Sequence, residues 1–345
     1  MHITPENKTF PSPDDLARQL REDVENICVP QGRRVGTEGH DEAEVYLLGR
    51  MTEIGCVPYR GDSIRLPYQS EGKSFVNLIG KIPGRNGGGK APLLIGAHYD
   101  SVIDAPCADD NAAAVAIALA VGGAVARGRG LDRDLVIAIF DSEEPPYFQG
   151  RSMGSNYFAE NQMFEAGMHG VIVMDLVGHD VPGLPGFGDL VFVTGTESHS
   201  ELSGVFENAP RPEPLKVVPT LNSYVGDMSD HGAFRKRGVP YFFLSCGHWE
   251  HYHRPTDTPD RLNFLKMAAI SELNFRFLQG MDGSPLKSAQ KQESLFETTA
   301  LEIRSLRNAF GLALPVLMGQ AGIKDLESRD DIDRLVRFLQ SGLGL

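Results

Sequence analysis

The sequence has few basic residues and no cluster of them. Of its 345 residues, 33 are Lys or Arg and 46 are Asp or Glu, which gives a formal net charge of −13 at pH 7. Nucleic acids and anionic membranes bind basic surfaces, so both are poor candidates as partners of this chain. An acidic chain remains compatible with metal cations.

Cysteine and long apolar runs are scarce as well. Cys28, Cys56, Cys107 and Cys246 lie far apart and form no C-x-x-C pair. No run approaches about 18 consecutive apolar residues, which argues against a transmembrane helix. Residues 1–16 lack the basic and then apolar pattern of a secretory signal, so we expect reduced cysteines and predict a cytoplasmic location.

The apolar residues indicate a globular protein in which strands alternate with helices. Apolar residues make up 41% of the chain and charged residues 23%, which is enough for an ample core. A helix is predicted over residues 12–28, with Ser12 as its N-cap, and a second one over residues 41–55. Farther along, short β-type runs alternate with helix-like segments. This order predicts an α/β fold of three αβα layers with a mixed, mostly parallel central sheet.

The strand segments are short and rich in Val, Ile, Leu and Phe, as in strands that are buried on both faces. The predicted strands cover residues 74–82, 91–100, 134–141, 169–178, 189–195 and 238–246. Further predicted helices cover residues 111–128, 154–167 and 261–281.

A polar segment at residues 281–290 separates a C-terminal region of different character. Apolar residues recur at helical spacing within 294–310 and 332–340. We therefore predict a catalytic domain over residues 1–284 and a helical extension over residues 285–345. We expect the extension to pack on the catalytic domain, and a dimerisation element, which would give a homodimer, is the alternative.

Three of the predicted strands end in side chains that bind metal ions. His98 and Asp100 lie at the end of the second predicted strand, Glu143 and Glu144 just after the third, and Asp175 near the end of the fourth. In an open parallel sheet, ligands bind just beyond the carboxyl ends of the strands. The sequence therefore places histidine and carboxylate donors from several elements at one edge of the sheet.

Two further segments add donors of the same kind. Asp109 and Asp110 precede an alanine-rich helix, and His248, His251 and His253 lie after the last strand. Each of these residues alone has an ordinary structural explanation, such as an N-cap or a satisfied polar side chain. Their coincidence favours a metal-dependent hydrolase with zinc as the first candidate, but spacing does not choose among the three histidines.

Five motifs, taken in this order, resemble one protein family: GAHYDS, ADDNA, FDSEE, VMDLVG and YHRPTDTPDRL. The chain is similar over Arg33 to Phe264 to the co-catalytic di-zinc aminopeptidases, a family that also includes glutamate carboxypeptidases and glutaminyl cyclases. The resemblance implies the zinc exopeptidase type of fold and a pair of zinc ions in the site.

The same resemblance implies a role for each matching residue. Glu143 corresponds to the general base, and Asp100 to the carboxylate that orients His98. Asp110 corresponds to the ligand that bridges the two ions, and Asp175 to the carboxylate ligand on the side of His98. The implied metal ligands are His98, Asp110, Glu144, Asp175 and His253.

The chain departs from the family pattern in two places. Ala113 and Ala114 replace a Ser-Gly pair, which affects helix packing and not the ligands. The segment PPYFQGRSMGS (145–155) is longer and richer in proline than the turn usual in the family. Because this segment borders the expected site, we expect substrate specificity to differ here, with Tyr147, Phe148 or Tyr252 as candidate pocket residues.

The motifs imply an exopeptidase, and aminopeptidase activity is the commonest activity associated with them. A metal-bridging hydroxide would attack an N-terminal peptide bond with Glu143 as general base, on a peptide or small amide substrate. The alternative is a glutaminyl-peptide cyclotransferase that uses the same scaffold with one zinc ion. A second alternative is a non-catalytic relative that only binds a partner.

Overall fold

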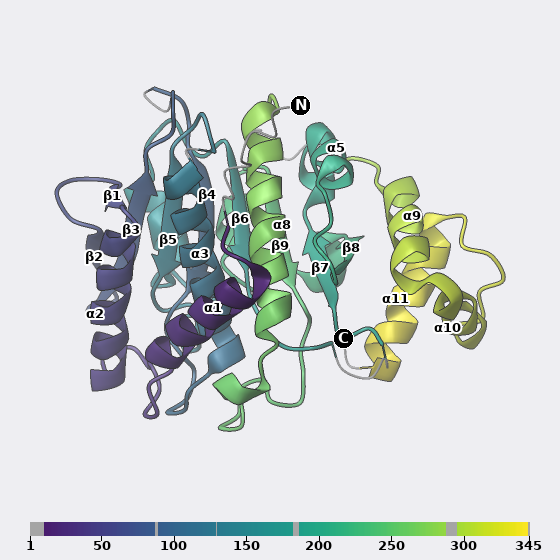
Figure 1. The fold of residues 1–345 in the computed structure, drawn as a ribbon, viewed down its shortest axis with the longest axis horizontal. Coiled ribbons are helices and arrows are strands. Elements are labelled where there is room, and N and C mark those ends of the chain that lie inside the picture. The colour runs from purple at the N-terminus through teal and green to yellow at the C-terminus, as the bar shows by residue number, and fades with distance from the viewer. Residues whose placement is uncertain (1–9, 87–88, 129, 182–185, 288–294, 344–345) are drawn as a thin grey trace, which may run out of the picture.

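The structure, a computed structural model, has a central mixed sheet between two layers of helices (Figure 1). The predicted three-layer α/β fold is therefore confirmed. The described residues are 10–86, 89–128, 130–181, 186–287 and 295–343. The described residues do not include residues 1–9, which belong to the N-terminal segment considered as a signal, or residues 288–290 of the polar segment.

The sheet is parallel at its centre, with antiparallel pairs on either side and one further parallel pair at an edge. Its strands are β1 (Val57–Pro58), β2 (Arg65–Ser70), β3 (Lys73–Ile82), β4 (Leu93–His98), β5 (Leu135–Phe140), β6 (Gly170–Met174), β7 (Leu190–Thr194), β8 (Lys216–Thr220) and β9 (Tyr241–Ser245). Within the described residues these nine strands have the order β1-β3-β5-β4-β6-β9-β7-β8, β2 also pairs with β3, and the parallel pair at an edge is β7–β8. The pairs β5–β4, β4–β6 and β6–β9 are parallel, which brings their carboxyl ends to one edge.

The six predicted strands are all present, whereas β1, β2 and β8 are not evident from the apolar pattern. Both β2 and β8 contain a proline, Pro67 and Pro219, and each pairs with one neighbour only. Proline cannot donate a hydrogen bond to a sheet and is therefore tolerated at edges, where the sequence also loses the continuous apolar run of a buried strand.

Helices cover both faces of this sheet. They are α1 (Pro13–Ile27), α2 (Glu38–Glu53), α3 (Ala113–Gly128), α4 (Gly154–Tyr157), α5 (Ser200–Asn208), α6 (Asn222–Val225), α7 (His231–Arg235), α8 (Phe264–Gly283), α9 (Thr299–Phe310), α10 (Leu314–Gln320) and α11 (Arg329–Leu343). The helix predicted over 154–167 is wrong in length, because α4 passes into a π-helical turn that ends at Gln162. The predicted N-cap of α1, Ser12, accepts a hydrogen bond from the Asp15 amide.

Alternate residues of each central strand enter the two layers of the core. Ile137 and Ile139 of β5 pack in the cluster that contains α1, α3 and α8, whereas Ala138 and Phe140 pack with Phe234 of α7 on the other face. This is the period of two expected for a strand, and because both faces are covered the strand is apolar throughout.

Helix α3 corrects the expectation about membrane-spanning segments. The segment Ala108–Gly128, with 21 residues and a mean hydropathy of 1.5, is long and apolar enough to cross a membrane by those criteria alone. However, 83% of its apolar window is buried inside the protein, as in the core helix of a globular fold. Alanine, valine, leucine and isoleucine give this helix its high hydropathy, and its small residues, such as Gly122 against Ile137 of β5, let it pack closely on the sheet.

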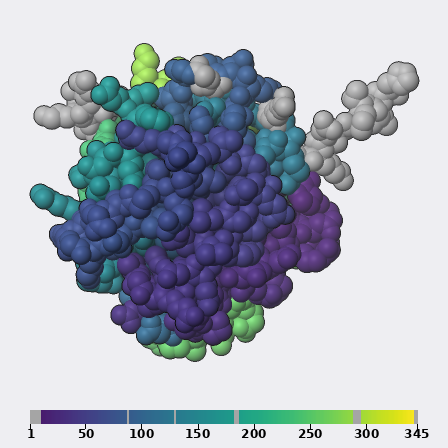
Figure 2. Space-filling model, turned by 90° about the vertical axis from the view of Figure 1, so that its left-hand side faces the viewer, coloured from purple at the N-terminus to yellow at the C-terminus, as the bar shows by residue number. Residues whose placement is uncertain are grey.

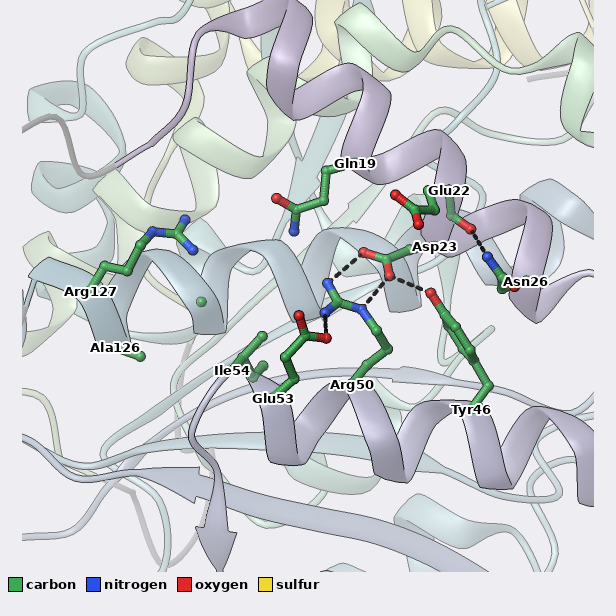
Figure 3. A pocket seen from close by; sticks show the side chains of 11 residues that line it. Gln19, Glu22, Asp23, Asn26, Tyr46, Arg50, Glu53, Ile54, Ala126 and Arg127 are labelled. Atoms are coloured by element: carbon green, nitrogen blue, oxygen red, sulfur yellow. Dashed lines mark hydrogen bonds and ion pairs between the residues drawn. The ribbon is translucent and has the colours of Figure 1, made fainter.

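The helices α1 and α2 are joined by one buried carboxylate. Asp23 accepts hydrogen bonds from the Tyr46 hydroxyl at 2.7 Å and from Arg50 Nε at 2.6 Å (Figure 3). A groove of about 830 Å³ lies beside this pair and is lined from α1, α2 and α3. The N-terminal segments, drawn in purple and blue, cover most of the face that lies on the left-hand side of Figure 1 (Figure 2).

The C-terminal helices pack on the far edge of the sheet, beside β7 and β8 (Figure 1). Leu306 and Phe310 of α9 and Leu335 of α11 share an apolar cluster with Leu190 of β7 and Val218 of β8. The extension thus forms its own small core against the sheet.

A buried arginine connects the N-terminal part of the chain to the segment after β4. Arg33 is fully buried and donates hydrogen bonds to the carbonyl oxygens of Tyr99, Pro106 and Cys107. These carbonyls belong to the loop between His98 and Asp110. Hydrogen bonds that involve a charged donor contribute more than neutral ones, so Arg33 stabilises the course of this loop.

Replacing Arg33 with methionine should destabilise the fold, because three buried carbonyl oxygens then lose their donor. We expect the free energy of unfolding to fall by about 3 kcal/mol, measured by urea denaturation. The matched control is Arg34→Met, because the Arg34 side chain forms an ion pair with Asp104 at 3.1 Å and both side chains are more than half exposed. That control should change stability by less than about 0.5 kcal/mol, and equal losses in the two variants would contradict our account of Arg33.

Candidate metal centre

The predicted donors converge at the carboxyl edge of the parallel strands. His98 is the last residue of β4, Glu143 and Glu144 follow β5, and Asp175 follows β6. Each apolar strand is buried, so the first polar residue after it emerges at the same edge as its neighbours. His253 reaches this edge from the loop after β9.

Two groups of donor atoms form there and share one carboxylate. His98, Asp110 and Asp175 make up the first group, and Asp110, Glu144 and His253 the second, with the donor atoms of each group within 4.8 Å of one another. Asp110 Oδ1 lies 3.3 Å from His98 Nε2, and Asp110 Oδ2 lies 3.2 Å from His253 Nε2. The two oxygens of Asp110 therefore face different groups, which is the geometry of a bridging ligand.

The two adjacent glutamates take different positions. Glu144 Oε2 lies 3.3 Å from His253 Nε2 and belongs to the second group. Glu143 belongs to neither group, and its Oε2 lies 3.9 Å from His98 Nε2. One carboxylate is thus placed to bind an ion, and the other remains beside the centre and free to exchange a proton.

Asp100 positions three of these residues at once. Its Oδ1 accepts a hydrogen bond from the Glu143 amide at 2.9 Å, and its Oδ2 accepts one from the Glu144 amide at 3.1 Å. The same carboxylate lies 3.4 Å from His98 Nδ1, the ring nitrogen that points away from the donor groups. Asp100 thus lies beside His98 and holds the backbone of the glutamate pair, and the resemblance implies that it orients the His98 ring.

Sequence reasoning missed a second set of carboxylates behind the centre. Asp257 accepts hydrogen bonds from the amides of Asp109, at 2.9 Å, and Asp110, at 3.1 Å. Asp109 in turn accepts from the Gly178 amide at 2.6 Å and lies 2.6 Å from His179 Nδ1. The signal was the aspartate of the TDTP motif, whose partners lie about 150 residues away in the sequence and are brought near only by the fold.

The other two candidate histidines stay out of both donor groups. The ring of His248 stacks on Tyr252 with centroids 4.3 Å apart, and His251 Nδ1 lies 2.9 Å from the Thr256 hydroxyl oxygen. The described structure thus selects His253 from the three, a choice that spacing had left open. Trp249 stacks on the His179 ring, with centroids 4.6 Å apart.

The donor atoms fit a metal cation, because several of them are buried without a hydrogen-bond partner. These atoms are His98 Nε2, Glu144 Oε1 and Asp175 Oδ1. Burial and the nearby Asp110 raise the pKa of Glu144 to about 8, and burial raises the pKa of Glu143 well above its usual range. These ionised carboxylates are therefore costly without positive charge, and nitrogen and oxygen donors in such a set suit zinc.

A cavity of about 560 Å³ opens on the centre, within the range of ligand pockets. Phe148 and Tyr252, two of the three candidate pocket residues, line it, and Tyr147 is absent from its described lining. The segment 145–155 therefore reaches the cavity through Pro145 and Phe148. Gln149 then donates a hydrogen bond to the Asp227 carbonyl at 2.8 Å, which joins this segment to the loop after α6.

This fold and these donor groups define a metallopeptidase of the zinc exopeptidase type. The profile of peptidase family M28 matches residues 77–278, more than half of the chain, and the protein belongs to that family. The family agrees with the resemblance that the five motifs carry.

Individual relatives are more distant. The curated protein YfbL of Escherichia coli (strain K12), described as uncharacterized, is 28% identical over 222 residues. The match takes in 52% of this chain and spans 63% of the length of YfbL.

Two solved structures share the fold at low sequence identity. A leucine aminopeptidase precursor from Bacteroides thetaiotaomicron VPI-5482 has a TM-score of 0.60 at 16% identity and covers 76% of this chain and 96% of that one. A glutaminyl cyclase from Bacteroides thetaiotaomicron, bound to N-acetylhistamine, has a TM-score of 0.60 at 16% identity, with 76% and 97% covered. Both show that the fold is shared, and their activities differ from each other.

Replacing His253 with alanine should remove one nitrogen donor from the second group. We expect the purified variant to lose about one zinc ion per chain relative to the unmodified protein, measured by elemental analysis after dialysis. The control is His251→Ala, two residues away, which should retain its metal. Equal metal content in the two variants would show that the second group does not depend on His253.

Proposed function

We propose that the protein is a zinc-dependent aminopeptidase that hydrolyses the N-terminal bond of a peptide or small amide. The observation that carries the proposal is the pair of donor groups that share Asp110, with Glu143 beside them and in neither. This arrangement provides ligands for two ions and a separate carboxylate for proton transfer, which is what amide hydrolysis at a two-metal centre requires.

The ligand assignment follows the two groups. His98 and Asp175 would hold one zinc ion, Glu144 and His253 the other, and Asp110 would bridge them. Zinc ions held there would lower the pKa of a water molecule and supply positive charge for the developing oxyanion. The pKa of His253 rises to about 10 because its contacts with Asp110 and Glu144 outweigh its burial, so zinc must displace a proton from this ring.

Glu143 is the proposed general base. Its carboxylate is buried beside His98 and its backbone is fixed by Asp100, so the side chain has a defined place next to the reacting bond. Burial raises its pKa, with His98 opposing the rise and Asp175 adding to it, and the raised value favours a carboxylate that accepts a proton from water. The same group then donates that proton to the departing amine.

A glutaminyl cyclase is the alternative, and the shared fold supports it only at that level. A cyclase that uses one zinc ion needs a single donor group, whereas both groups are complete among the described residues. The complete second group therefore favours hydrolysis.

Replacing Glu143 with alanine should abolish turnover and leave the metal content unchanged, because Glu143 lies in neither donor group. We expect kcat to fall by about 10²-fold or more, measured with an aminoacyl-arylamide that the unmodified protein hydrolyses. The matched variant is the neighbouring Glu144→Ala, which should lose zinc along with its activity. If Glu143→Ala loses zinc and Glu144→Ala keeps it, the two roles are reversed.

A substrate panel separates the two activities. We expect the zinc-loaded protein to release arylamine from aminoacyl-arylamides and to leave a peptide with N-terminal glutamine uncyclised, as followed by absorbance and mass spectrometry. Loss of ammonia with ring closure, and no cleavage, would replace the peptidase by the cyclase. No turnover of either substrate by a zinc-loaded protein would support the non-catalytic alternative.

A further inference from the structure

The C-terminal extension contributes directly to the cavity at the metal centre. Val336, Leu339 and Gln340 of α11 line the same cavity as Asp110 and Glu143. The family profile ends at residue 278, so α11 lies outside the part of the chain that it matches. This wall of the cavity is therefore built by a segment whose role neither the motifs nor the family match assigns.

Polar contacts hold α11 against the loop that forms the neighbouring wall. Tyr224 of α6 donates its hydroxyl hydrogen to Asp333, and its hydroxyl oxygen accepts from Arg329 at 3.2 Å. Gln340 donates to the Tyr224 carbonyl at 3.1 Å. Tyr224 itself lines the cavity, so two of its walls are fixed to each other along the length of α11.

Contacts with the rest of the extension also hold α11 in place. Arg329 makes a bidentate ion pair with Glu302 of α9, at 2.6 and 2.7 Å, and Glu302 is almost fully buried. Ile332 and Leu335 pack in the apolar cluster of the extension. Because α11 is held by an ion pair and by apolar packing, its side chains present a defined surface to the cavity and not a mobile one.

Most of the cavity lining is apolar, and its carboxylates belong to the metal centre. Its ionisable carboxylates and histidines lie around the two donor groups, and the described lining contains no Lys or Arg. Away from the centre the lining is mainly apolar, with Leu176, Phe192, Val225, Met228, Phe243, Val336 and Leu339. Such a surface suits an uncharged apolar group and disfavours an acidic one, which would lose its hydration without gaining a cationic partner.

We propose that α11 is a specificity-determining wall of the substrate pocket, which admits a bulky apolar side chain beside the reacting bond and limits its size. This inference rests on the proposed function only in that the reacting group binds at the metal centre. Val336 is the residue to test, because it is half-buried and faces the cavity from α11.

The test uses amino acid hydroxamates, which bind zinc through the hydroxamate group whatever reaction the protein catalyses. The dissociation constants of alanine, phenylalanine and glutamate hydroxamates are measured by calorimetry on the zinc-loaded full chain. In Val336→Trp the indole occupies space that a large side chain needs. We expect the phenylalanine compound to bind at least about tenfold more weakly, while the alanine compound changes by less than about twofold.

A second variant tests the same wall by charge. Val336→Lys places an ammonium group at the apolar end, and it should improve binding of glutamate hydroxamate relative to phenylalanine hydroxamate by about tenfold. The matched controls are Val316→Trp and Val316→Lys, because Val316 lies on α10 of the same extension, is 61% exposed and is not part of the described lining. Both controls should reproduce the unmodified affinities.

The outcomes separate this proposal from the proposed function. If the Val336 variants leave the ratios of the dissociation constants unchanged, or if the Val316 variants change them equally, α11 is not a wall of the pocket. If the unmodified protein binds no hydroxamate with zinc in place, the proposal is likewise overturned. If the ratios shift as expected but no arylamide is hydrolysed, the wall stands and the aminopeptidase assignment fails.

Discussion

Repulsion among buried carboxylates is the constraint on which the rest of the site depends. Asp110, Glu143, Glu144 and Asp175 are all buried at one edge of the sheet, and their neighbouring histidines cannot neutralise them alone. Asp100 and Asp257 accept hydrogen bonds from the backbone amides of Glu143 and Asp110, which holds these charges in place without neutralising them. This uncompensated charge is what makes the two donor groups suited to a metal cation.

The sequence predicts much of this centre for a simple physical reason. Apolar strands that are buried on both faces end abruptly, and parallel pairing then brings His98, Glu143 and Asp175 to one edge. The choice of His253 over His248 and His251 could not be made in this way, because all three lie in one loop whose conformation has no period. Only the fold shows which ring reaches Asp110.

Other features depend on contacts between distant parts of the chain. The edge strands β2 and β8 escape prediction because each contains a proline, and in β2 exposed positions also interrupt the apolar pattern. The part of α11 that faces the cavity could not be predicted either. An apolar residue such as Val336 has the same spacing whether it packs in a core or borders a pocket, so the pattern predicts the helix and not the surface it meets.

The positions of Arg33 and α11 show that the structure around the centre extends beyond the region shared with the family. Residues 77–278 contain every proposed metal ligand, yet the arginine that stabilises the loop before Asp110 precedes this region, and one wall of the cavity follows it. The match to the family and the set of residues that support and line the cavity therefore have different limits at both ends. Transplanting only the shared region into another protein would transfer the ligands without the parts that position and enclose them.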